Sequence, residues 1–402
     1  MPYGKTDVFV NIPDDRLIDI IKIPSPTRLI DLREGLKNSA ENPIGSERLS
    51  DLIKPAKNIV VAVQKPHCST LLMDLVEALN GLLGSWGVKS DDIRVIFSGD
   101  VAQPHRKQGS DTLNAGSSHS YTASELVTLG NFEGHEVKIN KVFMQADLKI
   151  AIGVFEPHYL TGYWGAPHTV APGLLDLKML EMLYKDALNK DYKDILTPDT
   201  SFEEVFRACD AAGLNFTINL FAERSGIIDI FSGDYKSAFR EALKKYNERY
   251  RQKVNGHIDV VVAGVGGAPY DSTLPNLYQA VSNALKVIDQ QGCVILASEC
   301  ENWLASKNLL DTLIKLRGGS ASSGWSTGYL PEFPLAYLFM KAIEYADISI
   351  VSIMPHYYSK KALKFRPYRT LNHALQTAIN RVNKQAKVLA VQDIYHTTFT
   401  RT

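Results

Sequence analysis

The chain has 402 residues, of which 45% are hydrophobic and 22% are charged, a balance typical of soluble globular proteins. Its formal net charge is zero and no block of like charges stands out, which argues against a nucleic-acid polymer or an anionic membrane as the main partner. No apolar run approaches the roughly 20 residues of a membrane span, and the length predicts two domains.

The N-terminus and the cysteines predict the compartment. Residues Met1 to Lys5 lack the apolar core of a signal peptide. The cysteines have neither the density of a disulfide framework nor the spacing of a metal site; they are Cys68, Cys209, Cys293 and Cys300. We therefore expect a cytoplasmic protein with reduced thiols.

An entry segment without recognisable chemistry precedes a run of alternating strands and helices, which is typical of a parallel α/β sheet. In the entry segment, residues 7–12 predict a short strand and residues 47–53 a helix. The run that follows predicts strands at 58–63, 93–97 and 148–152 and a helix at 71–83. Polar loops with histidines follow the strands; these residues are His67, His105, His158 and His168. Because ligands bind beyond the carboxyl ends of such strands, we expect the loops to converge on one site.

The longest of these loops, residues 153–173, is rich in glycine, proline, histidine and aromatic residues and has neither helical nor strand periodicity. A long loop of this composition at a strand end is typical of a binding or catalytic site. The alternative is a surface loop whose histidines are incidental.

Helices and strands continue to the C-terminus. Helices are predicted at 174–184, 202–211, 235–254 and 275–282, and strands at 215–221, 227–231, 257–263, 292–297, 348–353 and 387–391. The charged helix at 235–254 is the expected interdomain connector. The glycine-rich turn at 264–271 is either an anion cradle or a plain tight turn. Residues 318–328 are either a flap near the site or a surface loop.

Several short segments, taken together, are similar to one family. They are Asn42-Pro-Ile-Gly45, His105-Arg106, Glu156-Pro-His-Tyr159, Pro172-Gly173, Asn215-Phe-Thr-Ile-Asn219, Gly267-Ala-Pro-Tyr-Asp271, Tyr278-Gln279 and Ala346-Asp-Ile-Ser-Ile-Val-Ser352. In order and spacing they resemble the lactate racemase family of nickel-pincer-dependent 2-hydroxyacid racemases and epimerases.

The resemblance implies an α/β fold with two domains, residues 1–254 and 255–402, with parallel-type sheets and an active site in the cleft between them. In the family, two histidines exchange the proton of the substrate hydroxyl while a nickel-pincer nucleotide takes and returns the hydride. The matching residues are His105 and His158. Imidazole suits this role because its pKa of about 6.5 permits proton transfer near neutrality.

Other positions have expected roles in binding. The proposed substrate contacts are His67, Arg106, Tyr278 and Gln279. The proposed cofactor contacts are His168, Gly266 and Gly267.

The chain departs from the family where the cofactor is attached. The family loop Pro-His-x-x-Ala-Gly-x-Ser-Gly-Gly-x-Lys ends on the lysine that binds the cofactor, and here His168 takes that position after Ala166-Pro167. No histidine stands at 182–184, where the family has a nickel ligand. Gln64-Lys-Pro-His67 replaces a motif with a substrate-holding arginine, and Ser282 replaces a lysine. The chain therefore resembles a divergent member of this family that lacks the cofactor-binding lysine.

Two alternatives follow for His168. Its imidazole could ligate nickel, zinc or iron directly, in a site shared with the other loop histidines. Alternatively it packs beside Trp164 and Pro167, with no metal or cofactor bound.

Two functions are consistent with these residues. The first is a 2-hydroxyacid racemase or epimerase, an isomerase that acts on a small carboxylate other than plain lactate. The second is a repurposed, non-catalytic relative that binds a small carboxylate, sugar acid or nucleotide. A homo-oligomer is compatible with either function.

Overall fold

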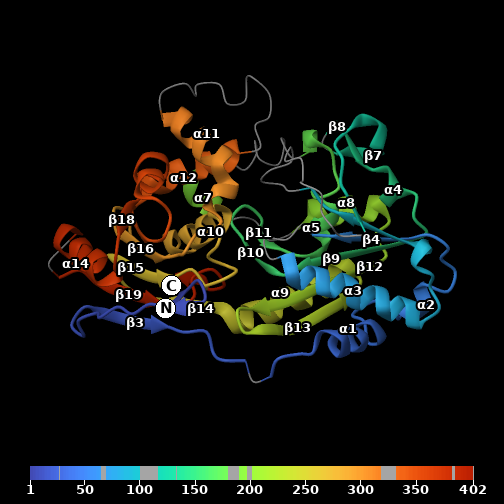
Figure 1. Ribbon diagram of the computed structural model, residues 1–402, viewed down its shortest axis with the longest axis horizontal. Coiled ribbons are helices and arrows are strands. Elements are labelled where there is room, and N and C mark those ends of the chain that lie inside the picture. The colour runs from blue at the N-terminus through green and yellow to red at the C-terminus, as the bar shows by residue number, and fades with distance from the viewer. Residues whose placement is uncertain are drawn as a thin grey trace.

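The computed structural model describes residues 1–26, 28–64, 69–99, 116–132, 134–179, 190–196, 202–317, 332–382 and 385–401. Two lobes lie side by side (Figure 1), and each contains one six-stranded sheet. Buried apolar side chains line both faces of each sheet, where helices cover it. The predicted α/β class with parallel-type sheets is confirmed.

The sheet of the first lobe is mostly parallel. Its strands, in spatial order, are β13 (Gly226–Gly233), β12 (Phe216–Glu223), β9 (Leu148–Val154), β4 (Ile59–Val63), β5 (Ile93–Phe97) and β6 (Gly116–Ser118). Strand β13 runs antiparallel to β12, and the other neighbours pair in parallel. The central strand β4 is buried along its whole length, which explains its unbroken apolar sequence.

The sheet of the second lobe is parallel throughout. Its strands, in order, are β18 (Arg366–Tyr368), β17 (Asp347–Val351), β16 (Cys293–Ala297), β15 (Val260–Gly264), β19 (Val388–Val391) and β3 (Leu17–Ile21). Because β3 comes from the N-terminus, the start of the chain packs with its C-terminal half. If the chain is divided into domains near residue 254, β3 is therefore a segment of the first domain that pairs with the sheet of the second.

Helices and short strands complete the lobes. The α-helices are α1 (Leu32–Glu41), α2 (Leu49–Leu52), α3 (Ser69–Ser85), α4 (Lys141–Met144), α5 (Ala166–Val170), α7 (Tyr192–Leu196), α8 (Glu203–Ala212), α9 (Tyr235–Tyr250), α10 (Leu274–Leu285), α11 (Lys307–Arg317), α12 (Phe333–Tyr345), α13 (His356–Tyr358) and α14 (Leu371–Val382). Short helical turns are η1 (Ser90–Asp92), η2 (Ala123–Glu125), η3 (Trp303–Ser306) and η4 (Ser359–Leu363). Hairpins form between β1 (Pro2–Tyr3) and β2 (Thr6–Asp7), β7 (Leu126–Phe132) and β8 (His135–Asn140), and β10 (Glu156–His158) and β11 (Gly162–Trp164).

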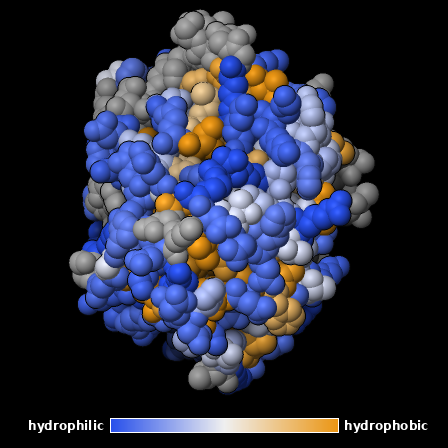
Figure 2. Space-filling model, turned by 90° about the vertical axis from the view of Figure 1, so that its left-hand side faces the viewer, coloured by the Kyte–Doolittle hydropathy of each residue, from blue (hydrophilic) through white to orange (hydrophobic). Residues whose placement is uncertain are grey.

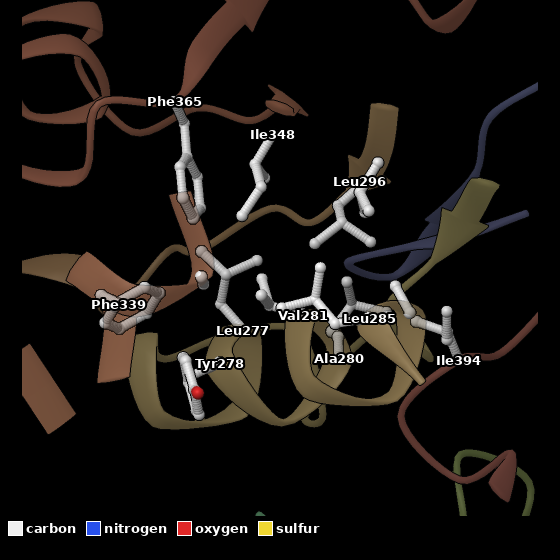
Figure 3. Close-up of a cluster of buried hydrophobic side chains, with 14 of the residues drawn as sticks. Leu277, Tyr278, Ala280, Val281, Leu285, Leu296, Phe339, Ile348, Phe365 and Ile394 are labelled. Carbon is white, nitrogen blue, oxygen red and sulfur yellow. The ribbon is translucent and has the colours of Figure 1, made fainter. Parts of the chain in front are cut away.

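Helix α10 lies at the centre of the second lobe and every residue in it is buried. Leu277, Val281 and Leu285 point toward Leu296 and Ile348 of the sheet (Figure 3). This packing accounts for the apolar side of the helix. Its polar residues face elsewhere, and they enter the candidate site described below.

Most predicted elements are confirmed, and three predictions are wrong in part. Of the expected strand at 7–12, only Asp7 lies in a strand, because β2 ends there and its partner β1 is equally short. The charged helix ends at Tyr250 because Arg251–Val254 forms β14, which pairs with β20 (Thr398–Arg401). Residues 153–173 contain a hairpin and a helix instead of an irregular loop. Residues 180–184 of the predicted helix at 174–184 and the whole segment 318–328 lie outside the described residues.

The turn Asn42-Pro-Ile-Gly45 closes the edge of the first sheet. The Ile44 N–H donates to the Ser232 carbonyl at 2.8 Å, and the Ile44 carbonyl accepts from the Asp234 N–H at 2.9 Å. Gly233 adopts φ +134°, and a Cβ there would lie 2.3 Å from the Ile44 carbonyl oxygen. This motif therefore has a structural role.

The outward face of the second lobe is mainly hydrophilic with scattered apolar side chains (Figure 2). Within the part of the chain that the structure describes, no helix combines the length and apolar character needed to cross a membrane.

Candidate active site

The stretch that follows β9 folds into the β10–β11 hairpin and then into α5. Its register pairs Glu156 with Trp164 and His158 with Gly162. Gly162 adopts φ +79° at the turn, a left-handed conformation that favours glycine. Helix α5 packs against β9, and a Cβ on Gly153 would lie 2.8 Å from the Ala166 nitrogen. The hairpin therefore carries His158 on a defined backbone at the carboxyl end of the sheet.

His158 is half-buried and is held by Thr161 at the turn of the hairpin. The His158 Nδ1 atom lies 3.0 Å from the Thr161 hydroxyl oxygen and 3.3 Å from the Thr161 backbone nitrogen. That hydroxyl donates to the Tyr163 carbonyl at 2.8 Å. Nδ1 can thus accept from the Thr161 N–H when it is unprotonated and donate to the Thr161 oxygen when it is protonated. When Nδ1–H donates to the Thr161 oxygen, Nε2 is the ring atom that can take up or release a proton.

Three rings of the hairpin and α5 are in contact with one another in a row. The Trp164 ring lies between the imidazoles of His158 and His168, with ring centroids 4.8 Å and 4.7 Å away, respectively. The predicted packing of His168 beside Trp164 is therefore present.

His168 is fully buried, and neither ring nitrogen has a hydrogen-bond partner. Its other ring contacts are Phe202 and Phe239. Burial lowers the pKa of His168 to about 3, helped by the neighbouring His158. The buried His119, by contrast, contacts the Leu175 carbonyl and the Asn140 side chain. His168 is thus a neutral imidazole in an aromatic cage.

A metal site has no support among the described residues, where no group of three or more His, Cys, Asp or Glu side chains could hold an ion. His67, His105 and Arg106 lie outside the described residues. Their expected places in the site therefore stay predictions.

An aromatic contact joins the hairpin to the second lobe. The Tyr159 ring stacks on His158 at 4.6 Å and meets the edge of Tyr278 of α10 at 5.1 Å. The Tyr278 and Tyr192 hydroxyl oxygens are 2.9 Å apart. Burial raises the pKa of Tyr278 well above its usual value, so its phenol stays protonated. Tyr159 thus contacts both His158 and Tyr278, two of the proposed site residues.

Gln279, the second proposed substrate residue on α10, is buried. Its Nε2 donates to the Asn283 Oδ1 at 3.2 Å, whereas its Oε1 has no hydrogen-bond partner. The side chain is therefore oriented by Asn283, and its Oε1 is a buried acceptor atom without a partner.

Gly266 and Gly267 lie in the turn after β15 with φ +98° and +71°. The N-terminal segment covers this turn: the Ala268 N–H donates to the Gly4 carbonyl, and the Gly4 N–H donates to the Asp271 carboxylate at 2.7 Å. An added Cβ on Gly266 would lie 3.1 Å from the Asp393 carboxylate. These contacts favour the tight-turn interpretation over an anion cradle.

Two site features escaped the sequence interpretation. Thr161, three residues after His158, is part of the turn that holds the imidazole. The hydrogen bond between Tyr395 and Glu156 joins residues that are 239 positions apart, so no local sequence pattern predicts it.

Comparisons with known proteins agree with this fold. Residues 3–192 match the model of the lactate racemase N-terminal domain. The lactate racemases of Thermoanaerobacterium thermosaccharolyticum and Lactiplantibacillus plantarum are 24% and 23% identical, and each alignment covers 98% of this chain and 97% of the relative. The lactate racemase apoprotein structure from T. thermosaccharolyticum superposes with a TM-score of 0.82 at 20% identity over 99% of both chains. A Thermotoga maritima protein gives a TM-score of 0.61 at 13% identity, covering 95% of this chain and all of that one.

Proposed function

This chain belongs to the lactate racemase family, and we propose that it is an isomerase that inverts the hydroxyl-bearing carbon of a small 2-hydroxyacid or related carboxylate. The observation that carries the proposal is His158, whose ring is oriented by Thr161 through Nδ1 at the end of the first sheet. The family relation supplies the substrate class. The proposed active site lies between the lobes, where Tyr159 meets Tyr278.

The proposed chemistry is a pair of proton transfers. Because Nδ1 faces Thr161, Nε2 is the His158 atom that we assign to exchange a proton with the substrate. A second base must act from the opposite side of the same carbon for inversion to occur, and His105 is our candidate. Gln279 would accept a hydrogen bond from the substrate through its Oε1 atom. Tyr278 would contribute mainly shape, since its hydroxyl is already bonded to Tyr192.

The residues present do not fit the covalently attached nickel-pincer nucleotide that the family resemblance implies. The attachment position holds His168, which is fully buried and enclosed by Trp164, Phe202 and Phe239. Histidine also cannot form the linkage that lysine makes. We therefore derive no step through this cofactor. Direct proton abstraction then requires a substrate whose carbon is acidified by a second carbonyl group, which excludes plain lactate.

The aromatic side chains that enclose His168 also favour a second function, that of a binding protein. A relative that no longer carries the cofactor could bind a small carboxylate, sugar acid or nucleotide between the lobes without turnover. The neutral, unpartnered imidazole of His168 supports this alternative because it offers no charge for catalysis.

The test combines substrates with a label. Single enantiomers of 2-hydroxyacids, with and without a carbonyl group adjacent to C2, are incubated in D2O and followed by chiral chromatography and mass spectrometry. Inversion with deuterium at C2 is the expected result, because an imidazole exchanges its proton with solvent, whereas a hydride that is taken and returned stays unlabelled. His158→Ala and His105→Ala should each abolish inversion, and His135→Ala, at an exposed position, should not.

Two outcomes would change the assignment. Inversion that survives in both histidine variants would refute the two-base mechanism. No turnover across the panel, with a carboxylate still bound in calorimetry, would favour the binding protein. Elemental analysis and intact mass of protein made in a host with the pincer pathway complete the test, since bound nickel with a mass adduct would contradict the misfit at His168.

A further inference from the structure

We propose that Tyr395 and Asn283 are positioning residues, which hold the His158 hairpin against α10 through a network of hydrogen bonds. The network runs from Gln279 through Asn283 and Tyr395 to Glu156. Its effect on turnover rests on the proposed function. The contacts themselves do not depend on that function.

The first link joins the second lobe to the hairpin. The Tyr395 hydroxyl donates to the Glu156 Oε2 at 2.7 Å, and Tyr395 is only 4% exposed. Glu156 begins β10, two residues before His158, and pairs with Trp164 across the hairpin. Hydrogen bonds to a carboxylate are stronger than those between neutral groups. The bond therefore fixes the hairpin relative to the segment after β19.

The second link joins that segment to α10. The Asn283 Nδ2 donates to the carbonyls of Ile394 at 2.9 Å and Tyr395 at 3.1 Å. Its Oδ1 accepts from Gln279 Nε2 and from Lys286 Nζ, and Asn283 is fully buried. Because both sides of this amide are bonded, its orientation is fixed, and it orients Gln279 in turn.

The segment that carries Tyr395 has supports of its own. The Ile394 N–H donates to the Gly264 carbonyl at 2.9 Å, and the Tyr246 hydroxyl donates to the His396 carbonyl at 2.8 Å. Loss of the Tyr395 hydroxyl should therefore leave the segment after β19 in place, whereas the hairpin loses its hydrogen bond to that segment. This separates an effect on His158 from a general loss of structure.

The consequence is geometric. At one end of the hydrogen-bond network lies Glu156, two residues before the proposed acid/base residue His158. At the other end lies Gln279, the proposed substrate contact. A reacting group misplaced by about 1 Å can lose roughly 100-fold in rate. The network would therefore set the position of His158 relative to a substrate held by α10.

The test is a double-mutant cycle of Tyr395→Phe and Glu156→Gln. Tyr395→Phe should lower kcat about 10-fold with KM within about twofold, because positioning is lost while binding remains. Glu156→Gln should lose less, since its amide oxygen still accepts the hydroxyl. The double variant should match Tyr395→Phe. Tyr357→Phe, at an exposed tyrosine, is the control that should change nothing.

A measurement that needs no turnover distinguishes the positioning role of Tyr395 from the proposed function. The imidazole signals of His158, assigned with His158→Gln, are followed by NMR as a function of pH. They should shift or broaden in Tyr395→Phe and stay unchanged in Tyr357→Phe, whether or not a substrate is found. Unchanged signals, or kinetic effects that simply add in the double variant, would overturn the positioning role. If Tyr395→Phe does not fold, the Glu156→Gln signals decide in the same way.

Discussion

Replacing His168 by leucine tests whether this residue is a neutral part of the core. The substitution keeps an apolar group of similar size against Trp164 and Phe239 and removes the imidazole. Burial lowers the pKa of His168 to about 3 in the folded protein, whereas an unfolded chain has a histidine pKa of about 6.5. Between these values the unfolded state binds a proton that the folded state does not.

The sign and size of the effect follow from that difference. A histidine with a depressed folded pKa stabilises the protein less as the pH falls below 6.5, because protonation favours the unfolded chain. At 1.36 kcal/mol per pH unit, the 1.5 units from 6.5 down to pH 5 amount to about 2 kcal/mol. The wild type should thus lose about 2 kcal/mol more than His168→Leu between pH 7 and pH 5.

Urea denaturation of both proteins at half-unit pH steps provides the assay. The difference between the two free energies of unfolding removes the contributions of titrating groups that do not interact with His168, such as the buried His119. A difference that stays constant from pH 7 to pH 5 would refute a neutral, enclosed His168. It would instead indicate a charged or solvent-connected imidazole at this position.

Three further predictions address the hairpin, the second lobe and the sheet edge. Thr161→Val should lower kcat/KM about 10-fold and shift its pH profile, whereas Thr161→Ser should retain both, in steady-state assays on any substrate found. Tyr192→Phe should lower the free energy of unfolding by about 1–3 kcal/mol in urea, because the buried Tyr278 hydroxyl loses its partner. Gly233→Ala should lower it by more than about 2 kcal/mol, since its Cβ would collide with the Ile44 backbone; a change below about 0.5 kcal/mol, as at an ordinary surface site, would contradict this.

The fold could be predicted from local patterns where burial is uniform. Strands β4 and β15 are buried at every position, so their sequences are apolar runs that stand out from the surrounding chain. Pairing between distant segments leaves no such mark. Strand β3 joins the second sheet beside β19, some 370 residues away in sequence, and its pattern of alternating burial is incomplete.

The candidate site could be predicted only in part for a related reason. His158 was identified by the motif around it, and its place at the end of a sheet follows from β9. The hairpin that carries it was missed, because Gly162 and Pro157 interrupt the alternation by which strands are recognised. The state of His168 was also beyond reach, since its cage includes Phe202 and Phe239 from other helices.

The two histidines of this stretch are physically coupled, and the coupling favours His158 as the residue that carries the proton. His158 helps to lower the pKa of His168 across the Trp164 ring. Interaction between two titrating groups is reciprocal, so a charge on His168 would disfavour protonation of His158 to the same extent. Since burial keeps His168 neutral, a proton taken up by this pair resides on His158, where Thr161 can accept its hydrogen bond. A neutral His168 and the proposed proton exchange at His158 are therefore compatible within one hairpin and helix.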